Sequence, residues 1–379
     1  MVTKKLVLNF DLGGGVKVDT YILLYKDKPI LAPNLYLFNM AKSGFLISAI
    51  KTYSDCLKKF FNVLFDAQHA DSSFPSWTAI QESQMNAYLN AYLKQDQKFQ
   101  DSTVDLHITV ISMFYSFAFD YGLISSPKNF SFNYEKTDEL MPKSSMMNEI
   151  YMDEKTFKKE VLASVKSNKP FIKERNELIL CLGYYAGFRT HEVVISGNLN
   201  VIQLREQLPK LEPNDWKPQS IDLKILGKGI KTRVVPIPPE LVDRIYKFLW
   251  GRASFIKSGS LISTERGRDL TDDQFASDLF TSCKRVILSG EVLDRNVWDL
   301  REYHKLRYCY GTNAVAYCYN NQYDPWIFVP QWMGHSDRSI TFDYVFFDAV
   351  LHQRHEVMSK LALEKTEYAK RVFGKGVKK

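Results

Sequence analysis

The second half of the chain carries six residues whose types suit attack on a phosphodiester. In chain order they are Arg189, Lys228, His304, Arg307, His335 and Tyr344. Such a reaction needs a nucleophile, cations that neutralise the nonbridging oxygens and a proton donor for the departing oxygen. Tyr344 is the candidate nucleophile, and because its reference pKa is about 10 it needs cationic surroundings to attack near neutral pH. Guanidinium groups are permanently charged and match phosphate oxygens, so Arg189 and Arg307 are the expected phosphate ligands.

The residues around the two arginines predict how each is held. A helix is expected to end at Gly187 and Thr190 to cap the next helix, which places Arg189 at a corner with free backbone N–H groups. His304 and Arg307 are three residues apart on a predicted helix, so they share one face. Both features would bring positive charge to a single phosphate.

A β-hairpin is predicted between these two regions. Residues 221–225 and 233–237 alternate in polarity on either side of a glycine-containing turn. Lys228 lies at the tip, where it would reach into a DNA groove and act as a general acid if nearby cations lower its pKa. Lys231 and Arg233 follow on the returning strand and are expected to contact DNA.

Taken singly, these residues have simpler explanations. Arg189 and Glu192 are spaced like a surface ion pair of a helix. Lys228 suits any solvated turn, and Tyr344 is one of 21 tyrosines, most of which must pack in the core or on the surface. It is the ordered set, with its local spacings, that favours the catalytic interpretation.

The rest of the chain predicts a mainly α fold with a small β-hairpin or sheet. Residues 1–36 alternate in short runs around a triple glycine, which indicates an N-terminal arm or β-ribbon. Residues 37–130 carry three apolar stripes at helical spacing and are expected to form a small helical bundle. A polar linker at 131–150 would lead to a mixed, mostly helical domain at 151–348, followed by a C-terminal helix and basic tail at 349–379.

Composition sets broad limits on function. The 379 residues carry a net charge of +7, which permits a polyanionic partner but does not demand one. The five cysteines form no CxxC pair and indicate buried free thiols in a reducing compartment. His352 and His355 alone do not complete a metal site. With no signal-peptide core and no run of about 20 apolar residues, a cytoplasmic, nucleoid-associated protein is expected.

The ordered set resembles the tyrosine recombinase (phage integrase) family. The matches are Gly187-x-Arg189-x-x-Glu192, the hairpin string from Gly227 to Pro236, His304-x-x-Arg307, Gly334-His335 and, nine residues later, Tyr344. The predicted bundle at 37–130 is similar to the family's core-binding (SAM-like) domain, and residues 151–348 are similar to its mixed α/β catalytic domain. The intervals between Arg189 and Lys228 and between Arg307 and His335 look longer than usual, which leaves the subfamily open.

The resemblance implies a site-specific recombinase. Tyr344 would form a 3′-phosphotyrosyl link and release a 5′ hydroxyl, and strand exchange would pass through a Holliday junction. No metal ion, ATP or other cofactor is expected. The implied partners are double-stranded DNA with specific attachment sites and three further copies of the chain, with the segment after Tyr344 docking on a neighbouring protomer. The additional segment 1–36 favours the integrase of a mobile element.

Two other functions remain open at this point. A type IB topoisomerase-like enzyme would perform the same cleavage but relax supercoils as a monomer. A non-catalytic DNA-binding protein on a recombinase scaffold would bind DNA without forming a covalent product. The proton donor is open as well: Lys228 is favoured by the resemblance, and His335 is the alternative. Trp332 is expected to pack under the site, and contact with the phosphate is the alternative.

Overall fold

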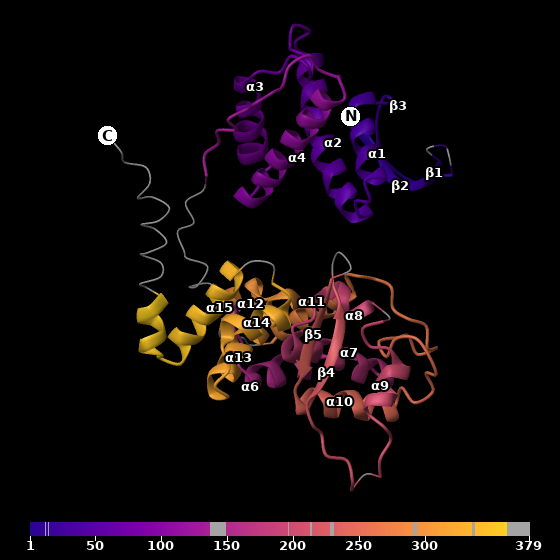
Figure 1. Cartoon of the computed structure of the whole chain (residues 1–379), viewed down its shortest axis with the longest axis vertical. Coiled ribbons are helices and arrows are strands. Elements are labelled where there is room, and N and C mark those ends of the chain that lie inside the picture. Colours follow the sequence, from indigo (N-terminus) through magenta and orange to yellow (C-terminus); the bar gives the residue numbers. More distant parts are fainter. Residues whose placement is uncertain are drawn as a thin grey trace. The chain divides into compact units, whose positions relative to one another are not determined.

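The structure is a computed structural model that describes residues 1–361 except 12, 14, 137–148, 196, 213, 228–230, 291–293 and 336–337. The chain folds as two compact units, Met1–Glu139 and Leu140–Lys379 (Figure 1). Each unit has its own hydrophobic core and its own small antiparallel sheet among helices. The predicted fold class, mainly α with small β elements, is confirmed.

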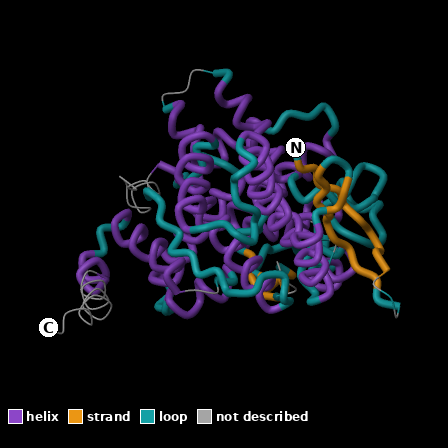
Figure 2. Tube along the Cα trace, turned by 90° about the horizontal axis from the view of Figure 1, so that it is seen from above, coloured by secondary structure: helices purple, strands orange, loops and turns teal. Residues whose placement is uncertain are grey.

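The N-terminal unit is a helical bundle with a β-hairpin against it, drawn in orange in Figure 2. Its elements are β1 (Val2–Asp11), β2 (Lys17–Tyr25), β3 (Lys28–Pro29), α1 (Leu31–Lys42), α2 (Ile47–Ala70), α3 (Glu82–Ala87), the π-helical η1 (Tyr88–Asp96) and α4 (Asp101–Asp120). The three apolar stripes lie on α2, on α3 with η1, and on α4, and these helices supply most of the buried core residues. The predicted ribbon ends before residue 36, because α1 begins at Leu31 and buries Tyr36 and Leu37.

The segment after α4 is attached to the bundle. Glu82, Asn86 and Asn90 stand one helical turn apart on α3 and η1. Their side-chain oxygens accept hydrogen bonds from backbone N–H groups within residues 131–135, at 2.9, 3.0 and 3.0 Å. The start of the predicted linker is therefore an ordered strap, whereas 137–148 lie outside the described residues.

The C-terminal unit is built around two helices that pack against each other, α7 and α13. Its elements are α6 (Glu154–Thr156), η2 (Phe157–Val161), η3 (Leu162–Ser164), α7 (Pro170–Ala186), α8 (Thr190–Val194), α9 (Val201–Gln207), β4 (Ile221–Leu226), β5 (Thr232–Ile237), α10 (Pro239–Trp250), α11 (Phe275–Leu288), α12 (Arg295–Leu300), α13 (Tyr303–Asn320), α14 (Pro325–Met333) and α15 (Arg338–Leu351). Strands β4 and β5 pair antiparallel, from Ile221 opposite Ile237 to Leu226 opposite Thr232, as the alternation predicts. The Tyr303 hydroxyl at the start of α13 donates to the Ile179 carbonyl of α7 at 3.2 Å.

The chain turns after α15 and resumes as a helix at residues 355–361. The Asp348 carboxylate, which is fully buried, pairs with Arg354 Nε and His352 Nδ1, both at 2.8 Å. Leu361 then joins the core of its own unit. The predicted C-terminal helix is thus interrupted, and the basic tail at 362–379 lies outside the described residues.

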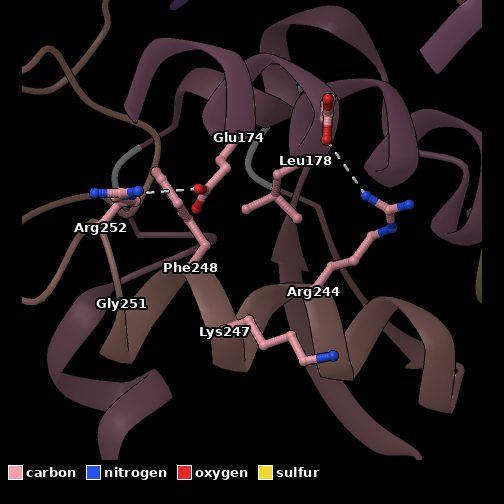
Figure 3. A pocket seen from close by; sticks show the side chains of 8 residues that line it. Glu174, Leu178, Arg244, Lys247, Phe248, Gly251 and Arg252 are labelled. Carbon is pink, nitrogen blue, oxygen red and sulfur yellow. Dashed lines mark hydrogen bonds and ion pairs between the residues drawn. The ribbon is translucent and has the colours of Figure 1, made fainter. Parts of the chain in front are cut away.

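Helix α7 borders two polar regions of the unit. Its C-terminal end leads into the corner at Gly187 that the sequence singled out. Its first turns and α10 line a hollow of about 540 Å³ (Figure 3). Two ion pairs flank this hollow, Glu174 with Arg252 and Glu177 with Arg244, and all four side chains are partly exposed.

The interior agrees with the composition. All five cysteines are buried and unpaired, as predicted. Among the helices that the structure describes, none combines the length and the apolar run needed to cross a bilayer. Across the same residues, no three His, Cys, Asp or Glu side chains gather as a metal site would require.

Candidate active site

The turn from α7 to α8 is shaped by Gly187. This residue is left-handed (φ 62°), and a Cβ added to it would lie 2.4 Å from Cδ1 of Tyr310. Only glycine therefore fits both the backbone and the close ring. Two residues later Arg189 caps α8, where Oε2 of Glu192 accepts from its backbone N–H (2.7 Å) and Oε1 from its Nη1 (2.8 Å). The corner predicted from the sequence thus exists, but Arg189 and not Thr190 occupies the cap position, and Thr190 is the first residue of α8.

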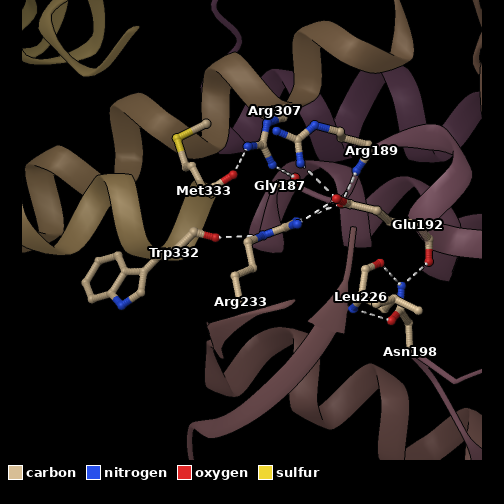
Figure 4. Close-up of polar contacts among 9 residues, drawn as sticks. All are labelled: Gly187, Arg189, Glu192, Asn198, Leu226, Arg233, Arg307, Trp332 and Met333. Atoms are coloured by element: carbon tan, nitrogen blue, oxygen red, sulfur yellow. Dashed lines mark hydrogen bonds and ion pairs between the residues drawn. The ribbon is translucent and has the colours of Figure 1, made fainter. Parts of the chain in front are cut away.

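Glu192 is an anchor at the centre of the site. Its side chain is fully buried, and Arg233 on β5 donates Nη1 to Oε1 and Nη2 to Oε2 at 2.6 and 2.7 Å (Figure 4). Burial by itself would raise the pKa of this carboxyl. The hydrogen bonds and charge of Arg233, with those of Arg189, more than offset burial and hold the pKa to about 2. Glu192 is therefore ionised across the neutral range.

Arg307 lies deeper than Arg189. It is 3% exposed, and its guanidinium donates to the carbonyl of Gly187 through Nη1 and to that of Met333 through Nη2. Burial and the charges of Arg189 and Arg233 lower its pKa to about 10, which leaves it charged at neutral pH. Arg307 thus ties α13 to the ends of α7 and α14 while adding a second positive charge beside Arg189.

His335 and Tyr344 face each other beside this cluster. Their rings are nearly parallel, at an interplanar angle of 11° with centroids 5.7 Å apart, and His335 Nδ1 lies 2.9 Å from Oγ1 of Thr341. Burial and the charges of Arg307, Arg189 and Arg233 lower the pKa of His335 to about 4, so the imidazole is neutral at neutral pH. The ring of Tyr344 packs against Gly311 of α13, where an added Cβ would come within 2.6 Å.

Tyr344 is covered in this structure. It is 4% exposed, and burial, with the neighbouring Tyr308, raises its pKa above the ordinary value despite the charge of Arg307. The prediction that cations would activate the phenol therefore does not describe this conformation, because desolvation outweighs them. His304 is exposed on α13 and lies edge-on to Tyr308 with centroids 5.9 Å apart, and Tyr308 lies 5.6 Å from Tyr344.

The structure brings most of the predicted residues to one place. Arg189, His304, Arg307, His335 and Tyr344 gather around the corner between α7 and α8. Lys228 lies outside the described residues, so its position is not assigned.

The two predicted DNA contacts on β5 differ from each other. Lys231 is exposed, as a DNA contact would be. Arg233 requires a correction: it is 9% exposed and bound to Glu192 and to the Trp332 carbonyl. Its side chain points into the protein because β5 alternates, and this position faces the core.

Two polar residues of the site were not identified from the sequence. The sequence analysis matched Glu192 to the string Gly-x-Arg-x-x-Glu and weighed it as a surface partner of Arg189, but gave it no role in the site. Asn198 carried no signal; its Nδ2 donates to the carbonyls of Glu192 (2.8 Å) and Leu226 (3.0 Å), and its Oδ1 accepts from Leu226 N–H (2.6 Å). Trp332 packs against Phe328 as expected, with centroids 5.6 Å apart, while its carbonyl accepts from Arg233.

The known proteins that are similar to this chain in sequence or fold are DNA recombinases and integrases. No family model matches the chain. The tyrosine recombinase XerC of Alcanivorax borkumensis is 23% identical over 249 residues, which are 65% of this chain and 69% of that protein. The site-specific recombinase XerH, solved with a palindromic difH substrate, has a TM-score of 0.55 at 18% identity, covering 86% of this chain and 84% of that one.

A second solved structure gives the same result. The Tn1549 transposon integrase, in complex with a circular intermediate DNA, has a TM-score of 0.53 at 13% identity, covering 86% of this chain and 99% of that one. With 86% of the chain covered in each case, these likenesses extend over both units. The chain therefore has the fold of these tyrosine recombinases, and its sequence is similar to that of one of them.

Proposed function

We propose that this protein is a site-specific DNA recombinase, the integrase of a mobile element, which cuts and rejoins duplex DNA through Tyr344. The observation that carries the proposal is the meeting of Arg189, Arg307, His335 and Tyr344 from four separate segments of the chain. Two guanidinium groups beside a tyrosine suit attack on a phosphodiester. XerH and the Tn1549 integrase, which share this fold, were solved with DNA substrates, and this supports DNA as the partner.

The proposed step is balanced without a cofactor. Oη of Tyr344 attacks the scissile phosphorus, and the bond from phosphorus to O5′ breaks. The phenol proton passes to a base, for which the neutral imidazole of His335 is our candidate, and O5′ takes up a proton. The products are a 3′-phosphotyrosyl ester and a 5′ hydroxyl, and the ester keeps the bond energy for rejoining. Lys228 remains the expected donor to O5′, with His335 as the alternative.

Access to the phenol is part of this proposal. Because Tyr344 is 4% exposed, its ring or the groups that cover it must move before the hydroxyl meets a phosphate. Arg189 is the more accessible guanidinium, with 29% of its side chain exposed, so we expect it to meet the phosphate first. Arg307 then adds charge from its fixed position behind.

The experiment that tests the proposal uses suicide substrates. Nicked duplexes carrying the candidate element ends are incubated with wild type, Tyr344→Phe and Tyr317→Phe and then run on denaturing gels. Tyr317 is the matched control, because it is a 52% exposed tyrosine on α13. A shifted covalent band is expected from wild type and from Tyr317→Phe. No such band is expected from Tyr344→Phe.

Each other result contradicts the proposal in a recognisable way. Tight DNA binding without any band would indicate a non-catalytic DNA-binding protein. A band that survives in Tyr344→Phe would assign the nucleophile to another tyrosine. Relaxation of a supercoiled plasmid that has no element end would indicate topoisomerase-like chemistry in place of exchange.

We also propose that four copies act together on two DNA sites. The support is the function itself, since two duplexes each cut on two strands need four tyrosines. Light scattering of the protein with one element-end duplex and with the paired sites should give two and four copies of the chain respectively. A single copy on every DNA would contradict this assembly.

A further inference from the structure

The base of the β4–β5 hairpin is attached to the arginine corner at both of its strands. On the β4 side, Asn198 makes three hydrogen bonds that join Leu226 to the carbonyl of Glu192. On the β5 side, Arg233 makes its bidentate contact with the Glu192 carboxylate (Figure 4). Both strands thus end on the same residue of α8, immediately before and after the hairpin tip.

Arg233 has a third contact that fixes its own orientation. Nε donates to the carbonyl of Trp332 at 2.9 Å, so all three guanidinium nitrogens have an acceptor. A Cβ added to Gly334 would lie 3.0 Å from Cδ of Arg233, which shows how closely α14 ends against this side chain. The guanidinium is therefore held in one plane between β5, α8 and α14.

The Glu192 carboxylate is shared between two arginines with different surroundings. Oε1 accepts from both Arg233 (2.6 Å) and Arg189 (2.8 Å), and Oε2 accepts from Arg233 Nη2 (2.7 Å) and the Arg189 backbone (2.7 Å). Arg233 is buried, whereas Arg189 is partly open. The buried arginine thus sets the plane of the carboxylate, and the carboxylate sets the direction of the open arginine.

We infer that Arg233 is a positioning residue for phosphate cleavage: through Glu192 it aims Arg189 at the scissile phosphate, and it does not itself contact DNA. This inference rests on the proposed function. It makes a clear distinction between arginine and lysine, because a lysine keeps the charge opposite Glu192 but has one nitrogen in place of a planar fork. Arg233→Lys should therefore fold yet leave the carboxylate, and with it Arg189, free to rotate.

The test compares Arg233→Lys with Arg252→Lys, an identical substitution in the ion pair with Glu174 beside the hollow between α7 and α10. Single-turnover cleavage is measured at saturating DNA on two substrates. One has the natural scissile phosphodiester and the other a methylphosphonate, in which a methyl group replaces a charged nonbridging oxygen. DNA affinity at several salt concentrations and thermal melting are recorded for each variant.

We expect Arg233→Lys to cleave the natural substrate about tenfold to a hundredfold more slowly than wild type, since misaimed catalytic groups have effects of this size. DNA affinity and its salt dependence should be unchanged. On the methylphosphonate, Arg233→Lys should recover most of the lost rate relative to wild type, because the group that Arg189 neutralises is absent. Arg252→Lys should match wild type on both substrates.

Three results would overturn the inference. Wild-type cleavage by Arg233→Lys would remove any positioning role. Equal losses on both substrates would indicate a structural role without aim at the phosphate. Weaker, less salt-dependent DNA binding with a normal rate at saturation would make Arg233 a DNA contact. Failure of the proposed function is separate, since wild type itself would then form no covalent product on either substrate.

Discussion

The C-terminal unit uses the same residue types, arginine and glutamate, in two places with opposite surroundings. Beside the hollow between α7 and α10, Glu174 with Arg252 and Glu177 with Arg244 stand 3.4 and 3.6 Å apart, and their side chains are 23–59% exposed (Figure 3). In the corner, Glu192 and Arg233 are 2.6 Å apart with side chains 0% and 6% exposed (Figure 4). Solvation, and not residue type, separates a surface pair from a site.

Burial changes what each pair does for the protein. An exposed ion pair is screened by water and contributes about 0–1 kcal/mol to stability. A buried pair gains little net stability, because removing both charges from water is costly, but losing one partner leaves an isolated charge inside. The buried charges of the corner therefore fix the orientation of its side chains and add little net stability. A substitution in the corner should lower the unfolding free energy far more than a substitution beside the hollow.

The largest expected effect comes from breaking the buried pair. Arg233→Met should lower the unfolding free energy of the C-terminal unit by about 3–5 kcal/mol, because Glu192 would remain buried with Arg189 alone. Urea unfolding followed by tryptophan fluorescence measures this, since five of the six tryptophans lie after residue 139. A loss no larger than that of Arg252→Met would refute the contrast.

The pair of Glu192 and Arg233 should also make the unfolding free energy depend on pH in the acid range. The pKa of Glu192 is about 2 in the fold, against about 4.3 in an unfolded chain. A lowered carboxyl pKa contributes stability that is present above about pH 4.3 and is lost as pH falls towards 2, here about 3 kcal/mol in total. The stability difference between wild type and Glu192→Gln should therefore shrink over that window.

Urea unfolding at a series of pH values measures this difference. Glu174→Gln is the matched control, since that carboxylate is 43% exposed. The control should show no comparable change between pH 4.3 and 2. A gap between wild type and Glu192→Gln that stays constant down to pH 2 would show that Arg233 does not hold Glu192 ionised.

A smaller effect should come from the backbone of the corner. Gly187→Ala must adopt a left-handed conformation and also displace the Tyr310 ring, 2.4 Å from the new Cβ. Gly122 in the N-terminal unit has a similar φ of 68° with nothing within 4 Å. Gly122→Ala should therefore lower the unfolding free energy only by the cost of the left-handed conformation, about 1–2 kcal/mol, and Gly187→Ala should lower it by more. Equal losses in urea unfolding would mean that the ring yields freely.

The smallest effect is expected at the hollow. Arg252→Met should change the unfolding free energy by less than about 1 kcal/mol at low salt, and by less still at 1 M salt, where charges are screened. Parallel urea titrations at the two salt concentrations would detect the trend. A larger, salt-independent loss would show that this pair belongs with the buried ones.

Much of the fold could be predicted because its signals are local. The stripe on α2 and the alternation of β4 and β5 depend on the period at which side chains return to one face. The break after α15 could not be predicted, since residues 352–354 contain neither glycine nor proline. It depends on Asp348, which is buried by the rest of the unit and pairs with Arg354.

The candidate site divides in the same way. Five candidate residues could be predicted from their order and local spacing, because each lies in a short sequence motif: Arg189, His304, Arg307, His335 and Tyr344. The burial of Arg233 could not be predicted from the sequence. A strand position predicts alternation, but which face meets the core depends on helices far along the sequence.

The sequence by itself determined which residues are candidates for the chemistry, since side-chain type decides charge, nucleophilicity and reach. It also determined most helices and both hairpins, because periodicity is local. Only the tertiary structure decided the state of those residues: Glu192 as a buried anchor, Arg307 behind Arg189, and Tyr344 covered and protonated. The reason is that pKa and accessibility depend on desolvation by segments from all over the unit, a property that no single stretch of sequence contains.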